Sequence, residues 1–202
     1  MAYGDFTLDD LEQKFGVKNL QKRLFTRFEP VEPGDILKKE LEDVGRLPIR
    51  SEKAKSEWIV VPVLRELRNR NDQFFTIFSG EKLNADEEKG LKGECDFILA
   101  RDTGTFNINY PIIQIVEAKK NDIELGVPQC AAQLIGAKVF NSKKGVELSK
   151  VFGCVTTGND WLFMVLEDDL IIIDLKIYFL NEIENVLGVF QSIIDYYKNL
   201  LK

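Results

Sequence analysis

The sequence predicts an α/β fold in which a mixed central sheet is flanked by helices. The first observation is a set of short apolar runs with the period-two alternation of strands, at residues 73–79, 93–100, 112–119, 151–156, 161–167 and 170–175. The second is a set of helical segments that precede, interrupt and follow these runs. Their order is helix, three strands, helix, strand, then extra strands and a closing helix, which is typical of α/β architecture.

The composition fits one globular domain with a small extension. The chain has 202 residues, 45% of them hydrophobic, which is enough for a full core. A net charge of −6 argues against a protein that coats nucleic acid with its whole surface, although a local basic groove is compatible with it. Three separated cysteines predict neither a disulfide framework nor a zinc site. We therefore expect a cytoplasmic protein with no signal peptide and no membrane span.

We expect residues 1–50 to form an N-terminal helical extension that packs on a main domain of residues 51–202. Thr7 is a suitable N-cap for a helix over 7–15, and 34–45 has the pattern of a second amphipathic helix. Between them, residues 14–28 carry five basic side chains and no acid. A cationic run of this length suits either phosphate contacts or a solvated face.

Residues 51–70 predict the first helix of the main domain. Ser51 can cap its start, and Pro62 predicts a kink or a boundary near that start. An apolar stripe at helical spacing runs through Val60, Val63, Leu64 and Leu67. Continued backwards, this stripe meets Glu57. A buried carboxylate needs a partner or a metal ion, whereas the alternative is an ordinary solvated helix acid.

Two neighbouring strands carry charged residues near their ends. In residues 93–100, alternation predicts one face with Glu94, Asp96 and Ile98 and the other with Cys95, Phe97 and Leu99. In residues 112–119, it predicts one face with Ile113, Ile115, Glu117 and Lys119 and the other with Ile112, Gln114, Val116 and Ala118. If the two strands pair, Asp96, Glu117 and Lys119 converge.

The C-terminal half predicts two helices separated by strands. Pro128 suits the first turn of a helix over about 127–141, on which Gln129 and Gln133 lie one turn apart. After the last strands, Asn181 and Glu184 have the spacing of a capping box for a helix that ends near residue 200.

Carboxylates, lysines and a metal ion are the chemistry that the composition leaves open. The chain contains no histidine, which excludes Ser-His-Asp and Cys-His systems and HExxH zinc hydrolases. Converging carboxylates repel each other unless a cation lies among them. Mg²⁺ prefers oxygen ligands and binds through one or two carboxylates together with substrate phosphate, and a lysine beside it can orient an attacking water. Such a site suits phosphodiester hydrolysis.

The acid-x-lysine pattern alone is weak, because it occurs four times: Glu12–Lys14, Glu87–Lys89, Glu117–Lys119 and Asp174–Lys176. The first falls on a predicted helix and the second in a charged loop. Asp174–Lys176 also ends a strand, but its nearest upstream acids belong to a tight turn. Only Glu117–Lys119 has an acid on the preceding strand and a glutamine-bearing helix after it.

In this order, the segments GECDF, IVEAK and PQCAAQL resemble the PD-(D/E)xK nuclease superfamily, over roughly residues 51–157. The segment SEWIVVPVLREL is similar to the nuclease part of type I restriction R subunits and to similar stand-alone bacterial proteins. The resemblance implies a restriction-endonuclease-like αβββαβ core and an endonuclease that uses Mg²⁺ or Mn²⁺. It implies metal ligands Glu57, Asp96 and Glu117, a catalytic Lys119, and a supporting Gln133, with Gln129 beside it.

The sequence departs from the superfamily pattern at Cys95, where a proline is usual. Glu94, predicted on the same face as Asp96, is either an alternative ligand or a charged neighbour. DNA is the implied substrate. No sequence-reading module is evident, so we expect any specificity to come from a homodimer or a partner protein. One alternative is a non-catalytic DNA-binding or assembly factor of the same fold, acting in restriction or recombination. Another is a phosphate-ester hydrolase acting on nucleotides, for which the sequence offers no nucleobase pocket.

Overall fold

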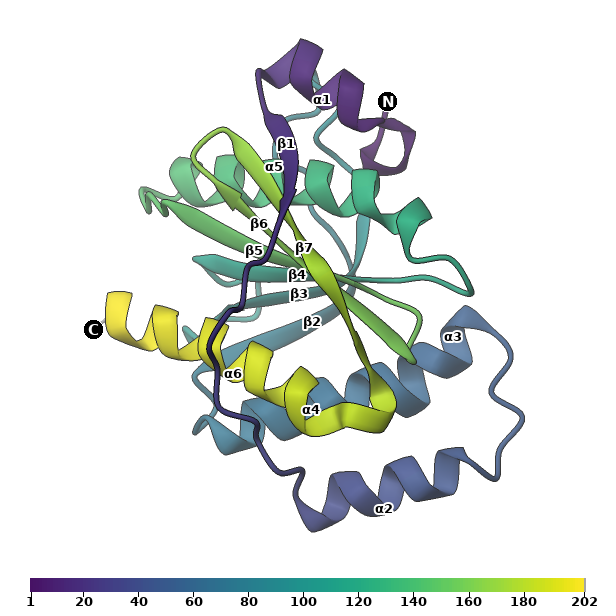
Figure 1. Ribbon diagram of the computed structural model, residues 1–202. Helices are drawn as coiled ribbons and strands as arrows, with labels where there is room; N and C mark the ends of the chain where they lie inside the picture. Colours follow the sequence, from purple (N-terminus) through teal and green to yellow (C-terminus); the bar gives the residue numbers. More distant parts are fainter. Residues whose placement is uncertain (202) are drawn as a thin grey trace.

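A computed structural model describes residues 1–201, in which helices and strands alternate along the chain (Figure 1). The strands are β1 (Lys18–Lys22), β2 (Phe75–Lys82), β3 (Glu94–Arg101), β4 (Ile112–Ala118), β5 (Lys150–Thr156), β6 (Asp160–Glu167) and β7 (Leu170–Phe179). The helices are α1 (Leu8–Phe15), α2 (Asp35–Val44), α3 (Glu52–Lys55), α4 (Val61–Arg70), α5 (Val127–Lys143) and α6 (Ile183–Leu200). From α3 to β5 they follow the predicted order of helix, three strands, helix and strand.

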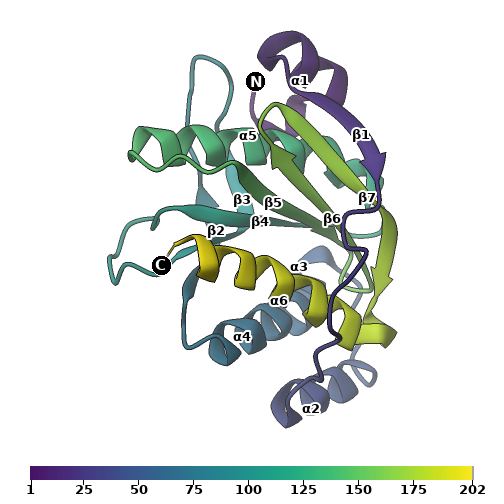
Figure 2. The same cartoon turned by 60° about the vertical axis from the view of Figure 1, so that its left-hand side comes forward.

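The strands form one mixed sheet in the order β1-β7-β6-β5-β4-β3-β2. Helix α5 covers one face, with α1 beside it, while α4 and α6 cover the other face and α2 packs outside α4 (Figures 1 and 2). Each face buries its own apolar cluster, as expected for a sheet between two helical layers. The predicted α/β class, with a mixed sheet flanked by helices, is confirmed.

Strand direction brings the ends of β4 and β5 to the same edge of the sheet. Strands β2, β3 and β4 pair antiparallel, whereas β4 and β5 pair parallel and are connected through α5. The pairing of β4 with β5 reaches Ala118 and Thr156, and the Lys119 N–H continues it by donating to the Thr156 carbonyl at 2.7 Å. Lys119 is therefore held by the sheet although it lies beyond β4.

The first 50 residues are only partly helical. Helix α1 begins as predicted, because the Thr7 hydroxyl accepts the Asp10 N–H. Residues Lys18–Lys22, in contrast, form the edge strand β1 and pair parallel with β7. All five residues of β1 are exposed, so its lysines lie in solvent at the sheet edge. The segment expected to be a helical extension thus supplies a strand to the sheet of the main domain.

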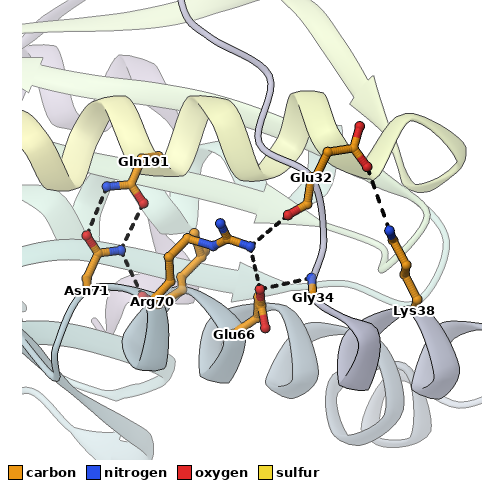
Figure 3. Close-up of polar contacts among 8 residues, drawn as sticks. Glu32, Gly34, Lys38, Glu66, Arg70, Asn71 and Gln191 are labelled. Atoms are coloured by element: carbon orange, nitrogen blue, oxygen red, sulfur yellow. Dashed lines mark hydrogen bonds and ion pairs between the residues drawn. The ribbon is translucent and has the colours of Figure 1, made fainter.

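Polar contacts tie the chain before α2 to α4, and α4 to α6 (Figure 3). The Arg70 guanidinium donates to the Glu32 backbone carbonyl and to the Glu66 carboxylate, each at 2.7 Å. Asn71 and Gln191 exchange side-chain amide hydrogen bonds, both 2.9 Å long. Because reciprocal and charge-assisted hydrogen bonds restrict geometry, these contacts hold α4 in place against both neighbours.

Side-chain alternation fails at two places in the central strands. A register shift between Leu99 and Ala100 places Ile112 in the cluster under α5 and Ile113 in the opposite one, the reverse of the prediction. Cys95 lies in the cluster under α5, away from Phe97, although alternation predicted that the two share a face. The register shift accounts for the first correction, because a strict period of two does not contain such an irregularity.

Helix α6 begins at Ile183 without the predicted capping box. The N-cap position is Glu182, whose side chain accepts no capping hydrogen bond from the helix backbone. Apolar residues of α6 lie in the cluster shared with α4, so tertiary packing rather than capping stabilises its start. Within residues 1–201, neither α6 nor any other helix has the length and apolar character that a membrane crossing requires.

Candidate functional site

The site forms where β3 and β4 separate. Their pairing ends at Phe97 and Val116. Beyond this pair, the Asp96 side chain takes the place of a backbone acceptor on β3. Its Oδ2 accepts a hydrogen bond from the Ala118 N–H on β4 at 2.7 Å. Because the hydrogen bond satisfies one carboxylate oxygen, Asp96 is fixed at the end of β4 beside Glu117.

Glu117 is the most enclosed of the candidate acids, at 2% exposure. Its Oε1 accepts a hydrogen bond from Nζ of Lys119 at 2.8 Å, and its Oε2 accepts one from Nε2 of Gln133 at 2.8 Å. A buried carboxylate needs such partners, because an unpaired buried charge is strongly unfavourable. The predicted acid and lysine therefore do point to one spot.

Helix α5 supplies the two glutamines from above the sheet. Gln129 Oε1 accepts a second hydrogen bond from Nζ of Lys119, at 3.0 Å. Gln133 is fully buried, and its Nε2 also donates a hydrogen bond to the Glu94 carbonyl at 3.4 Å. Its Oε1 has no hydrogen-bond partner within residues 1–201. The spacing of one helical turn explains why both side chains face the same strand end.

Burial dominates the electrostatics of the two neighbouring carboxylates. Burial, together with the neighbouring charge of Asp96, raises the pKa of Glu117 to about 7, although Lys119 opposes the shift. Burial likewise raises the pKa of Asp96, against the Ala118 N–H and Lys119. Burial by itself lowers the pKa of Lys119. The negative charges of Glu117 and Asp96 and the hydrogen bond to Glu117 outweigh this effect, so the pKa of Lys119 is raised overall.

A cleft of about 360 Å³ opens beside Asp96, between β3 and the helix formed by α3 and α4. Four acids line it, namely Glu52, Glu57, Glu94 and Asp96. Glu52 and Glu57 are five residues apart, and in a regular α-helix only residues three or four apart share a face. Glu52 belongs to α3, whereas Glu57 belongs to the π-turn of residues Ser56–Val60 that joins α3 to α4.

Pro62 accounts for this π-turn. It has no N–H, so it cannot donate to the Trp58 carbonyl four residues earlier. The preceding N–H, that of Val61, instead donates to the Ser56 carbonyl five residues back. The kink or boundary predicted at Pro62 is thus a local widening of one continuous helix, directly beside the cleft.

Glu57 and Glu52 differ in how they relate to the buried acids. The Glu57 side chain is 56% exposed and lies 3.8 Å from Lys53, and within residues 1–201 it forms no hydrogen bond with Asp96 or Glu117. The charge of Glu52, in contrast, raises the pKa of both Asp96 and Lys119. Sequence reasoning missed Glu52, because the apolar stripe that pointed to Glu57 follows regular α-helical spacing.

The second acid-x-lysine pair at a strand end, Asp174–Lys176, has a different environment. Asp174 is buried, and its carboxylate accepts hydrogen bonds from the Leu24 N–H, the Lys176 N–H and the Tyr178 hydroxyl. Lys176 itself lies 4.7 Å from the Tyr178 ring centroid. This carboxylate therefore organises the backbone at the end of β1, and within residues 1–201 none of its hydrogen bonds involves a second acid.

The residues present fit a small divalent cation. Within residues 1–201, no three His, Cys, Asp or Glu side chains are already arranged as a metal cluster. Mg²⁺ needs only one or two carboxylates, however, since it keeps several waters. Asp96 and Glu117 supply hard oxygen ligands, and each carboxylate oxygen can accept more than one contact.

Comparison with known proteins adds no relative: no family model matches this sequence, and none of the curated proteins matches it.

Proposed function

We propose that the protein hydrolyses phosphodiester bonds in DNA with the help of Mg²⁺ or Mn²⁺, as an endonuclease-like enzyme of the PD-(D/E)xK type. The observation that carries the proposal is the hydrogen-bonded group in which Lys119 bridges Glu117 and Gln129 while Gln133 holds the other oxygen of Glu117. A solvated strand end would not bury these side chains or join them to one another.

The arrangement of elements supports the same proposal. The acid Asp96 and the pair Glu117–Lys119 come from adjacent antiparallel strands, and the next helix brings Gln133 to them. This combination of αβββαβ order, strand-end acids and a helix glutamine is what the resemblance to the superfamily implies. It also accounts for the buried, charged character of the site, which a purely structural sheet edge does not require.

Each residue has a distinct task in this proposal. Asp96 and Glu117 would hold the cation, with Glu52 or Glu57 as a further acid across the cleft. Gln133 keeps the Glu117 carboxylate from rotating, since its amide donates to Oε2. Lys119 orients the attacking water and stabilises negative charge at the phosphate, because its ammonium is held between Glu117 and Gln129.

The bound cation supplies Lewis-acid polarisation of the scissile phosphate and stabilises the charge that develops there. Recognition of a particular DNA sequence, in contrast, has no evident source within residues 1–201. We propose that it comes from a second copy of the protein or from a partner protein, as for a subunit that cuts where another subunit recognises.

Cleavage of plasmid and single-stranded DNA with Mg²⁺, with Mn²⁺ and with chelator tests the proposal. The wild type is compared with Lys119→Ala and with the matched control Lys176→Ala, which removes the lysine of the other strand-end pair. We expect metal-dependent cleavage that Lys119→Ala abolishes and Lys176→Ala preserves.

Two results would contradict the proposal. Folded wild-type protein that neither cleaves DNA nor binds Mg²⁺ or Mn²⁺ in calorimetry would favour a non-catalytic DNA-binding or assembly factor of the same fold. Cleavage that persists in Lys119→Ala would show that the lysine, and therefore the site, has been assigned wrongly.

A further inference from the structure

The cleft beside Asp96 continues into a second hollow of about 460 Å³ along α4 and β2. The two share three lining residues, Val61, Ser79 and Phe97, so together they form one groove. We call it the α4–β2 groove. Its helical wall carries Glu57 at the acidic end and Arg65 and Arg68 at the other, about 12 Å and about 16 Å from Glu57 along the axis by the rise of a helix.

The chemistry of the groove changes along its length. The acidic end, at Asp96, suits a cation and the phosphate bound to it. Farther on, Val61, Ile77 and Phe97 contribute apolar surface, and Thr76 and Ser79 contribute hydroxyls. An apolar lining of this kind contacts the faces of unpaired bases, which a duplex keeps stacked in its interior.

The arginines of the groove are not free cations. Arg65 forms an ion pair with Glu40, and Arg68 lies 3.6 Å from Asp102 and donates to the Phe75 carbonyl. The groove therefore offers arginine donors to a phosphate without a strong net positive field. Duplex binding through the backbone alone depends on several unpaired basic residues, so this surface favours a ligand that gains affinity from its bases.

An exposed tryptophan is the neighbour in sequence of residues that line the groove, and it is not itself among the lining residues. Trp58 belongs to the π-turn, directly after Glu57 and three residues before Val61, both of which line the groove. Its side chain is 51% exposed, although a large aromatic residue usually gains by burial. Stacking of a base on an exposed aromatic ring is a common means of binding single strands.

We propose that the α4–β2 groove binds a single strand of DNA, with a base stacked on Trp58 and the strand leading to the scissile phosphate at Asp96. The inference rests on the proposed nuclease function and adds the form of its substrate: a single strand or an unpaired end. Glu57 then belongs to the wall that guides the strand as well as to the acidic end of the groove.

The test measures binding of fluorescein-labelled oligothymidylate and of a duplex of the same length, with Ca²⁺ in place of Mg²⁺. Gels run after each titration verify that the DNA stays intact. We expect the single strand to bind about tenfold or more tightly than the duplex, and Trp58→Ala to weaken single-strand binding by about tenfold, the size of one base–aromatic stack.

Phe106→Ala is the matched control, because Phe106 is fully exposed in the loop between β3 and β4, which leaves β3 at the end opposite Asp96. It should bind like the wild type. Trp58→Phe should retain most of the affinity. Single-strand binding should quench the tryptophan fluorescence of the wild type but not that of Trp58→Phe, whose remaining Trp161 is buried.

Equal or tighter binding of the duplex, or unchanged binding by Trp58→Ala, would overturn the inference, as would no binding of either DNA. The same proteins are assayed for cleavage with Mg²⁺ and Mn²⁺, which separates this inference from the proposed function. Duplex cleavage that is unaffected by Trp58→Ala would support the proposed nuclease function and contradict single-strand binding in the groove. Single-strand binding that depends on Trp58, without any cleavage, would support binding in the groove and contradict the proposed nuclease function.

Discussion

Nζ of Lys119 lies 2.8 Å from Oε1 of Glu117, two residues earlier in the chain. The lysine side chain is 20% exposed and the glutamate 2%, so the ammonium lies between the buried carboxylate and solvent. Lys119 thus neutralises Glu117 in the metal-free protein. A bound cation would take over part of this role and leave the ammonium freer to act on a water or a phosphate.

Lys119→Met should therefore destabilise the metal-free protein more than the metal-bound one. Without the ammonium, Glu117 loses a charged hydrogen-bond partner, and we expect the free energy of unfolding to fall by about 1–3 kcal/mol. Saturating Mg²⁺ should restore most of this loss, since a cation at Asp96 and Glu117 replaces the missing charge. Urea denaturation with chelator and with Mg²⁺ measures both values.

Lys176→Met is the control for this experiment and should show no dependence on Mg²⁺, because Asp174 receives its hydrogen bonds from other groups. An equal loss of stability for Lys119→Met with and without Mg²⁺ would show that no cation reaches Glu117.

Glu52→Gln should weaken Mn²⁺ binding more than Glu57→Gln does. The charge of Glu52 acts on both Asp96 and Lys119, whereas Glu57 is mostly exposed and lies near Lys53. Isothermal titration calorimetry of the two variants gives their affinities directly, independent of any activity. A larger loss for Glu57→Gln would instead support the ligand set implied by the resemblance.

The pairing of β3 with β4 explains how much of the site could be predicted from the sequence. Period-two alternation located both strands, and their adjacency in the chain made antiparallel pairing the simplest arrangement. Asp96, Glu117 and Lys119 then had to lie at the same end. The role of Gln133 was implied by the resemblance alone, since helical spacing only placed it one turn from Gln129.

The features that were not predicted depend on backbone geometry or on contacts distant in sequence. Pro62 predicted only a kink or a boundary, and no side-chain pattern shows the π-turn that precedes it. The register shift at Leu99 exchanges the faces of Ile112 and Ile113. Residues Lys18–Lys22 have no apolar alternation, so their pairing with β7, about 150 positions later, could not be expected from local pattern.

Gln114→Met should stabilise the protein. Gln114 is fully buried in β4, and neither of its side-chain amide atoms has a hydrogen-bond partner within residues 1–201. Because an unsatisfied buried polar group is unfavourable and methionine has a similar shape, we expect the free energy of unfolding to rise by about 1–2 kcal/mol. Chemical denaturation measures the change, with the exposed Gln13→Met in α1 as control. A loss of stability would mean that Gln114 has a partner in solution, for example an ordered water.

Gly126→Ala should displace the Lys119 side chain although it replaces no charged residue. Gly126 directly precedes α5, and a Cβ there would come within 2.4 Å of Val155 Cγ1 and 3.0 Å of Lys119 Cγ. The lysine stem therefore packs against the bare glycine backbone, which helps hold its ammonium between Glu117 and Gln129. We expect the free energy of unfolding to fall by about 1–3 kcal/mol through overpacking.

The rate of metal-dependent cleavage by Gly126→Ala should fall by up to about 100-fold, because a shift of about 1 Å in a catalytic group has effects of this size. This decrease is larger than the loss of folding stability alone explains. The assay is run at a temperature at which circular dichroism shows the variant to be folded. Gly45→Ala is the control, since the nearest atom to a Cβ there is the Glu42 carbonyl oxygen at 3.4 Å. Full cleavage by folded Gly126→Ala would mean that the position of the Lys119 stem does not govern the reaction, and would leave the roles of Asp96 and Glu117 to be tested separately.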